Sequence, residues 1–443
     1  PNFTDGVHAM GMVTIFELVS NNWIETGNVQ PSFGSYALSA INPSSKVSVQ
    51  YNYTNTNIGF GSSLEFIDGS IAVGMGSFPI TGSVNANNAW TITQYGLVDI
   101  FSKTNNTWSM SSIIPVPYYG SSTNCPVSFG SALSYGDGLL LIGYPNDALD
   151  ETFSNPLTNA GSVFIYKFDG TKWNVFQKIV GWGRDRNIGD NLGQSIIFQD
   201  GFVFVGAPNH DYDTNNTNFL LNSGAVYIWQ QNGNSWSYNG KITSSSRTVG
   251  DMFGYSLASD TGIVVVGAPG SILDSSGNNS VTNAGAVYIL NQENGQWSII
   301  QKITASIRNA NDYFGRSISV NGLDLLVGIP GSSTNSSGVV SSTLTNAGAA
   351  EFYVLGDSWT FSTRVYAGDN MTTGDSFGSS VSVYGGIGIV GAPNHSYDSD
   401  GLHPLTNAGA AWIYSKSEST WTQMEKITGW GQDRNANDNM GYS

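Results

Sequence analysis

Short apolar runs alternate with polar, glycine-rich segments along the whole chain. Residues 251–304 contain four such runs, FGYSLAS, IVVVGAP, GAVYILN and WSIIQKI, separated by segments such as SDTG and QENGQ. Runs this short, bounded by Gly, Asn, Asp and Ser, are typical of β-strands joined by turns. The pattern predicts four short antiparallel strands in this segment.

The same pattern repeats along the sequence. A glycine preceded by Phe, Leu or Met recurs 61 to 69 residues apart, at Gly61, Gly130, Gly193, Gly254, Gly315, Gly378 and Gly441. A proline follows 15 residues after five of these glycines, in segments such as VVGAP at 265–269. A second glycine and then a tryptophan complete each unit, the tryptophans being Trp108, Trp173, Trp236, Trp297, Trp359 and Trp421. Six full repeats therefore start near residues 57, 126, 189, 250, 311 and 374.

A four-stranded sheet of this size cannot bury both of its faces alone, and radial stacking of such sheets solves the problem. The N-terminal segment, with Gly11 and Trp23, matches the second half of a repeat, and the C-terminal DNMGYS matches the beginning of one. The sequence predicts an all-β fold: a single domain over residues 1–443, forming a seven-bladed β-propeller of four-stranded antiparallel blades. The seventh blade is expected to be shared between residues 1–30 and 436–443.

That shared blade lacks about twelve residues, which would carry its second strand. Three explanations are open. The natural chain continues past Ser443 or begins before Pro1, a strand from a neighbouring molecule fills the slot, or the closing blade is distorted.

The pairing of F-G with V-G-A-P, as in 253–269 and 377–393, resembles the FG-GAP repeat, which is known from the propeller domains of integrin alpha subunits. The resemblance extends over essentially the whole chain and implies the propeller fold. Integrin-type repeats carry an Asp-rich calcium loop between the first two strands, where this chain has tight turns such as FQDG at 198–201. We therefore expect none of the integrin calcium sites here.

Composition narrows the classes of partner. The net charge is −16 with a pI near 4.4, which argues against a nucleic-acid-binding protein, because binding phosphates needs clustered Lys and Arg. The sequence has no apolar stretch of about 18 residues, so it predicts no membrane-spanning helix. The single cysteine, Cys125, excludes an internal disulfide and is expected to be a buried thiol.

Two loops after the G-A-P motif contain candidate calcium ligands. Asp211, Asp213 and Asn215 have the alternating spacing of a calcium loop, and Asp398 and Asp400 precede Gly401. Neither loop has the bidentate acid expected further along, so solvated loops are the favoured interpretation and no cofactor is expected, with calcium as the alternative. His210 and His395 occupy equivalent places in different repeats, which argues against a shared metal site.

Another acidic position recurs in five repeats, three residues before the repeat glycine: Asp190, Asp251, Asp312, Asp375 and Asp438. Two residues after the glycine stands a serine, at Ser195, Ser256, Ser317, Ser380 and Ser443. A ring of carboxylates that binds cations is one interpretation. We favour the other, in which each Asp accepts backbone N–H bonds and shapes the turn that enters the strand.

The chain contains eight sequons for N-glycosylation, at Asn2, Asn52, Asn105, Asn215, Asn278, Asn335, Asn370 and Asn394. Four of them fall in the long loops after G-A-P, where a bulky sugar has room. Trp182 and Trp430 stand in two nearly identical G-W-G segments and could stack on sugar rings, although packing between blades is the favoured role.

No metalloprotease, P-loop or nucleophile-elbow motif is present, and residues shared by every repeat do not make an asymmetric catalytic set. We therefore expect a non-enzyme: an extracellular or cell-surface structural or adhesive glycoprotein. Its expected partners are other extracellular proteins or copies of itself, and it would assemble into a surface or filamentous structure. A carbohydrate-binding propeller is the alternative, and an enzyme is a distant third.

Overall fold

The computed structural model describes residues 13–19, 22–29, 36–37, 48–49, 60–76, 82–84, 88–90, 96–117, 128–368, 370–429 and 434–443. The chain divides into two compact units, which are described separately. The N-terminal unit comprises Asn2–Gln194 and the C-terminal unit Ser195–Ser443.

The N-terminal unit contains two four-stranded antiparallel sheets, called blades 1 and 2. Blade 1 consists of β5 (Phe60–Ile67), β6 (Ser70–Met75), β9 (Leu97–Thr104) and β10 (Thr107–Pro115). Blade 2 consists of β11 (Leu133–Gly136), β12 (Leu139–Tyr144), β13 (Ser162–Phe168) and β14 (Trp173–Ile179). Three two-stranded sheets accompany them: β1 (Val13–Val19) with β2 (Asn22–Val29), β3 (Tyr36–Ala37) with β4 (Ser48–Val49), and β7 (Gly82–Val84) with β8 (Asn88–Trp90).

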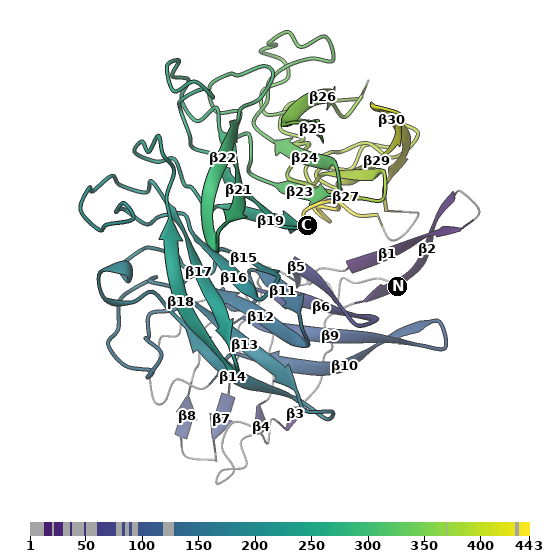
Figure 1. Ribbon diagram of the computed structural model, residues 1–443. Coiled ribbons are helices and arrows are strands. Elements are labelled where there is room, and N and C mark those ends of the chain that lie inside the picture. The colour runs from purple at the N-terminus through teal and green to yellow at the C-terminus, as the bar shows by residue number, and fades with distance from the viewer. Residues whose placement is uncertain are drawn as a thin grey trace. The chain divides into compact units, whose positions relative to one another are not determined.

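The C-terminal unit contains four further sheets of the same kind among the described residues, blades 3 to 6, and most of their strands are labelled in Figure 1. Blade 3 consists of β15 (Ser195–Gln199), β16 (Phe202–Ala207), β17 (Ala225–Asn232) and β18 (Ser235–Ile242), and blade 4 of β19 (Ser256–Asp260), β20 (Ile263–Ala268), β21 (Ala286–Glu293) and β22 (Gln296–Ile303). Blade 5 consists of β23 (Ile318–Asn321), β24 (Asp324–Ile329), β25 (Ala349–Leu355) and β26 (Trp359–Val365), and blade 6 of β27 (Ser380–Tyr384), β28 (Ile387–Ala392), β29 (Ala410–Ser417) and β30 (Thr420–Ile427). In each sheet the strands pair in chain order, as the sequence predicts for 251–304.

In the residues that the structure describes, the fold class is an all-β propeller with six four-stranded antiparallel blades, so the prediction of seven blades is wrong. Among the described residues, β1 pairs only with β2. Met440 forms a single parallel bridge with Gly409, just as Phe253 does with Gly224 and Phe314 with Gly285. The first strand of a blade is held by a ladder to the V-G-A-P strand, as β27 is to β28, whereas the described residues 434–443 form no strand and donate backbone N–H groups to the carbonyls of Thr406, Asn407 and Ala408 in the blade 6 loop. Residues 436–443 therefore dock onto blade 6 instead of starting a seventh sheet.

Neighbouring blades within a unit approach closely at the repeat glycine. The Ser256 hydroxyl donates to the Gly315 carbonyl of the next blade at 2.7 Å, and Ser195, Ser317 and Ser380 make the matching bonds to Gly254, Gly378 and Gly441. A Cβ on Gly267, the glycine of V-G-A-P, would lie 2.1 Å from that same Gly315 oxygen. The FG and GAP motifs thus leave room for backbone of one blade to contact backbone of the next.

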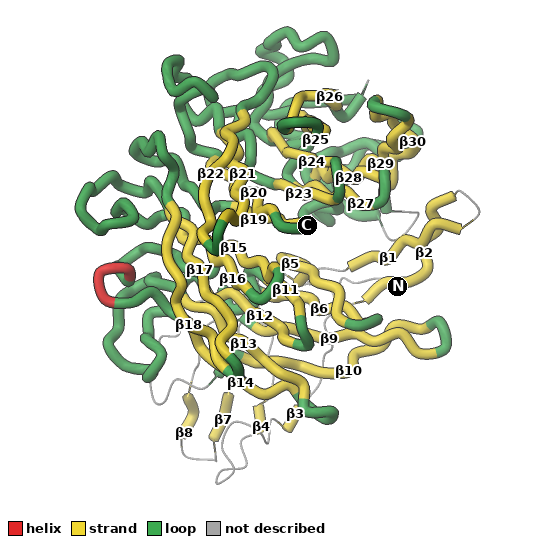
Figure 2. Tube along the Cα trace, viewed as in Figure 1, coloured by secondary structure: helices red, strands yellow, loops and turns green. Residues whose placement is uncertain are grey.

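The second strand of each blade is almost entirely buried, and the repeat tryptophans pack between sheets. Trp297 of blade 4 meets Phe204 of blade 3 edge to face at 4.8 Å, and Trp421 of blade 6 stacks on Phe352 of blade 5 at 4.0 Å. Besides strands and loops, the described chain has one short 3-10 helix, η1 (Gly183–Asp185), shown in red in Figure 2. No helix in these ranges is long and apolar enough to cross a membrane.

Candidate functional site

Each of blades 2 to 6 gathers three side chains, buried or half-buried, at equivalent positions, which we call its polar cell. One comes two residues after the proline of the GAP motif, one from the third strand, and one from the fourth strand, five residues after the repeat tryptophan. In blade order the sets are Asp147, Phe164 and Lys178; His210, Tyr227 and Lys241; Ser271, Tyr288 and Lys302; Ser332, Glu351 and Arg364; and His395, Trp412 and Lys426. The fourth-strand position always carries a cation.

In four of these cells the cation is a lysine that lies near an aromatic ring of the third strand. The Nζ-to-centroid distances are 5.2 Å for Lys178 on Phe164, 5.7 Å for Lys241 on Tyr227, 5.3 Å for Lys302 on Tyr288 and 5.3 Å for Lys426 on Trp412. The negative face of an aromatic ring attracts a cation, and more so when water is excluded. The ring and the residue after the proline therefore make a partly buried place for the lysine.

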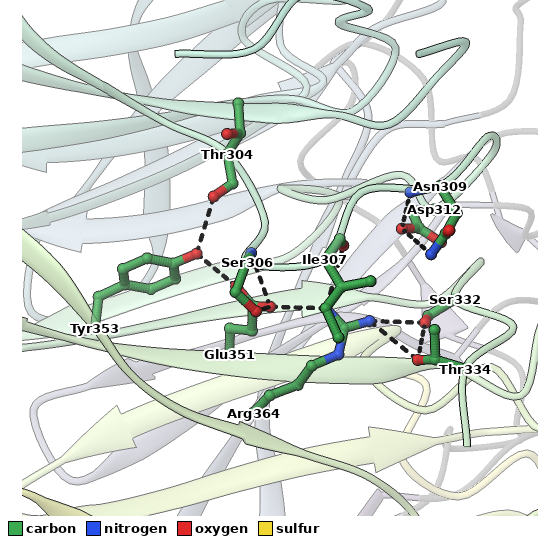
Figure 3. A network of polar contacts seen from close by, with 10 residues as sticks. All are labelled: Thr304, Ser306, Ile307, Asn309, Asp312, Ser332, Thr334, Glu351, Tyr353 and Arg364. Atoms are coloured by element: carbon green, nitrogen blue, oxygen red, sulfur yellow. Dashed lines mark hydrogen bonds and ion pairs between the residues drawn. The ribbon is translucent and has the colours of Figure 1, made fainter. Parts of the chain in front are cut away.

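The cell of blade 5 is built differently. Glu351 replaces the aromatic residue and Arg364 replaces the lysine, and Arg364 Nη1 lies 2.7 Å from Glu351 Oε1, with the two side chains 5% and 0% exposed (Figure 3). Glu351 also accepts bonds from the Ser306 N–H at 3.1 Å and from the Tyr353 hydroxyl at 2.5 Å. Burial and the Glu351 carboxylate raise the pKa of Tyr353 well above its usual value. The Glu351 carboxylate thus has an ion-pair partner and hydrogen-bond donors in its buried position.

Arg364 also binds the long loop of its own blade. Its Nη2 donates to the Ser332 hydroxyl at 2.8 Å and lies 3.3 Å from the Thr334 hydroxyl, both at the start of the loop after β24 (Figure 3). Among the described residues, the Arg364 Nε has no hydrogen-bond partner, and neither has Oδ1 of the nearby buried Asp312. Burial raises the pKa of Asp312 to about 6. The cell of blade 5 thus contains an ion pair, as that of blade 2 does, and it leaves one buried nitrogen, Arg364 Nε, without a partner among the described residues.

In the other blades a different arginine, four residues before the recurring Asp, fixes the long loop. Arg247 Nη2 donates to the Asp211 carbonyl at 2.8 Å, and its Nη1 donates to the Asn218 carbonyl at 3.1 Å. Arg186, Arg308 and Arg434 bind the carbonyls of their loops in the same way. Blade 5 has Met371 at this position, so Arg364 takes over the role.

The candidate calcium ligands are already engaged inside their loops. Asp213 Oδ1 accepts the N–H groups of Asn215 and Thr217 at 3.1 and 2.9 Å, and Asp211 Oδ1 accepts that of Asn222 at 2.7 Å. Asp398 accepts the Leu402 N–H at 2.9 Å, whereas Asn215 and Asp400 are exposed. The Thr217 N–H is the main cause that holds the pKa of Asp213 below its usual range. In the part of the chain that the structure describes, no three His, Cys, Asp or Glu side chains gather as metal ligands.

The recurring aspartates hold the turns that enter the blades, in agreement with the favoured interpretation. The Asp carboxylate accepts the N–H of the residue three positions earlier, at 2.7 Å for Asp190, 2.6 Å for Asp251, 2.7 Å for Asp312 and 2.7 Å for Asp375. Asp438 makes the same bond with Asn435.

The remaining predicted positions differ in exposure where the structure describes them. Trp182 precedes η1 and is 70% exposed, and Trp430 lies outside the described residues, as do Asn2, Asn52 and Cys125. Asn105, Asn215, Asn278 and Asn370 are exposed, whereas Asn335 and Asn394 are half-buried. Asn394 Nδ2 also donates to the Ser376 hydroxyl at 3.2 Å.

Sequence reasoning missed the polar cells, including His210 and His395 as members of them. A comparison of the internal repeats with one another could have revealed these cells. The position three residues after the second glycine is aromatic in four repeats, Glu351 in blade 5 and Asp99 in blade 1. Only the fold shows that this position faces the fourth-strand cation.

Comparison with known proteins supports the repeat assignment. The family model described as FG-GAP repeat matches residues 236–290 and 297–341, so the FG-GAP resemblance is confirmed over residues 236–341. No curated protein matches the chain.

Proposed function

We propose that this chain, whose residues 236–341 carry FG-GAP repeats, is an extracellular structural or adhesive glycoprotein that binds copies of itself or other proteins through its long loops. The observation that carries the proposal is that these loops are fixed in place and yet display apolar side chains. Phe219 and Leu221 in blade 3, Val339 and Val340 in blade 5, and Leu402 in blade 6 are all at least half exposed.

The blade 3 loop illustrates the combination. Arg247 binds its backbone at two carbonyls, and Tyr212 meets Phe219 edge to face at 5.5 Å across an antiparallel bridge. A loop that is already ordered loses little entropy on binding, and exposed apolar groups are the usual anchors of protein interfaces. Exposed Asn215 and Asn278, in the loops of blades 3 and 4, support the glycoprotein part of the proposal.

Sedimentation velocity over a range of concentrations tests the self-association. We expect wild-type oligomers that dissociate in a Phe219→Ser, Leu221→Ser variant. Ile300→Ser is the matched control, because Ile300 is 59% exposed but lies on strand β22 instead of a loop. If the two variants associate equally strongly, the loops are not part of the interface. A wild-type protein that stays monomeric would contradict self-assembly.

A carbohydrate-binding role is the second candidate, and the exposure of Trp182 favours it. An exposed aromatic ring can stack on the apolar face of a sugar. A glycan array probed with wild type and Trp182→Ala tests this: the role requires binding that disappears in the variant.

A further inference from the structure

The polar cell of blade 6 contains a hydrogen-bonded chain of three side chains. His395 Nδ1 lies 2.9 Å from Asp375 Oδ2, and His395 Nε2 lies 2.9 Å from Lys426 Nζ. Asp375 and His395 are fully buried. Because the carboxylate accepts the proton on Nδ1, Nε2 presents its lone pair to the lysine. A base oriented by a carboxylate and bonded to a nucleophile is the general arrangement of nucleophilic catalysis.

Lys426 has the surroundings of a neutral amine. Its Nζ has a second acceptor, the Asp398 carbonyl, at 2.7 Å. These two acceptors satisfy the two N–H bonds of a neutral amine and leave its lone pair free. An ammonium group has a third N–H, and the Trp412 ring, with its centroid 5.3 Å from Nζ, is a weaker partner than an oxygen.

The charges around Lys426 act in both directions. Burial is the largest effect and lowers the pKa of the Lys426 amine to about 8. Asp375, before β27, and Asp398, after β28, raise it, whereas Arg434, after β30, lowers it further. An ordinary lysine has a pKa near 10.4, so near neutral pH the neutral fraction of Lys426 is about 100 times larger.

We propose that Lys426 is a nucleophilic lysine that forms an imine with small aldehydes, with His395 as the base and Asp375 as the residue that positions His395. The Nζ lone pair attacks the carbonyl carbon, and the carbonyl oxygen takes up a proton to give a carbinolamine. His395 Nε2 accepts the two protons that Nζ loses, one after the other: the first is passed to the carbonyl oxygen and gives the carbinolamine hydroxyl, and the second is passed to that hydroxyl as it departs. Water leaves, and a C=N bond remains.

The lysines of blades 2 and 3 are more deeply buried than Lys426. Lys178 lies 2.8 Å from Asp147 and its side chain is only 3% exposed, so although burial lowers the pKa of its amine as well, a reagent has no open path to it. Lys241 contacts His210 at 3.0 Å but also donates to Asn216 Oδ1 at 2.7 Å, and it is buried. Lys426 is half-buried, which leaves a path for a small reagent.

Reductive labelling of the full chain tests the proposal. The protein is treated with acetaldehyde and cyanoborohydride at pH 7.5, and the modified lysines are quantified by peptide mass spectrometry. We expect Lys426 to react at least about tenfold faster than the exposed Lys172. His395→Gln should slow Lys426 by about 100-fold, the usual contribution of a positioned base, and leave Lys172 unchanged.

Asp375 also accepts the Thr372 N–H at 2.7 Å, so a variant such as Asp375→Asn can disturb the turn. The fold of each variant is therefore first compared with that of the wild type by circular dichroism. The pH dependence in wild type is a readout that needs no variant. Labelling of Lys426 should level off above pH 8, whereas labelling of Lys172 should keep rising to pH 9.5. Equal rates for the two lysines, parallel pH profiles, or a folded His395→Gln variant with an unchanged Lys426 rate would each overturn the proposal.

Discussion

Arg364 and Glu351 form a buried ion pair, 2.7 Å apart, at the two positions that hold a lysine and an aromatic ring in blades 2, 3, 4 and 6. Both positions differ together in blade 5. Glu351 without Arg364, or Arg364 without Glu351, would be a buried charge that lacks its partner. The two residues therefore form one unit.

This pairing predicts how substitutions in blade 5 combine. Glu351→Tyr alone leaves the Arg364 charge unpaired and should lower the free energy of unfolding by about 3–5 kcal/mol. The double variant Glu351→Tyr, Arg364→Lys recreates the cell of blade 4 and should recover most of that loss. Urea unfolding of the wild type, both single variants and the double variant gives the coupling energy. If the changes in unfolding free energy of the two single variants add up to that of the double variant, Glu351 and Arg364 do not act as one unit.

Asp99 predicts an unusual pH dependence. It lies in blade 1 at the position of Glu351, but Ile113 stands where the other blades have their cation, and Asp99 Oδ1 has no partner in the described part of the chain. Burial raises the pKa of this carboxyl to about 7, against about 3.9 in the unfolded chain. Between these values the folded state binds more protons than the unfolded state, so this group makes stability fall as pH rises from about 4 to 7.

Asp99→Asn should remove that contribution and raise the urea midpoint at pH 8 while changing it little near pH 4. Asp169→Asn is the control, because Asp169 is exposed and hydrogen bonds, that of the Thr171 hydroxyl foremost, keep its pKa below the usual range. If wild type and Asp99→Asn lose stability in parallel over this pH range, the carboxyl is not protonated in the fold.

Close backbone contact between blades predicts that the glycine of V-G-A-P tolerates no side chain. In Gly267→Ala the new Cβ would lie 2.1 Å from the Gly315 oxygen, so the blades must separate, at a cost of about 1–3 kcal/mol or more. Gly356→Ala is the control, since its nearest atom would be 4.0 Å away. Thermal unfolding should distinguish the two. Equal melting temperatures would show that the blades are not packed in this way.

The exposed sequons predict a specific glycosylation pattern. Secreted from a eukaryotic host, the protein should lose mass on treatment with peptide N-glycosidase, and Asn278→Gln should remove one glycan. Asn394→Gln should change little, because Asn394 is half-buried and bonded to Ser376. Full occupancy of Asn394 with an empty Asn278 would contradict the exposure argument.

Much of the fold was predictable from the repeat. Strand lengths, antiparallel order and the role of the recurring Asp follow from local patterns that occur in each unit, and the structure confirms them. The number of blades was not predictable in this way. GWGQDRNANDNMGYS has the sequence of a blade entry, yet Met440 makes only a bridge to Gly409, because a strand also needs a partner with which to form a ladder.

The sequence by itself determined the repeating unit, its four strands and its FG-GAP character, since these depend on turn residues and apolar runs close together in the chain. Only the tertiary structure decided which side chains share a cell. Glu351 and Arg364 are separated by a turn, and Asp375 and Lys426 by 51 residues, so their contacts depend on strand register and loop path. Burial then sets the charge state of these groups, because the energy of a charge depends on the water that surrounding residues remove.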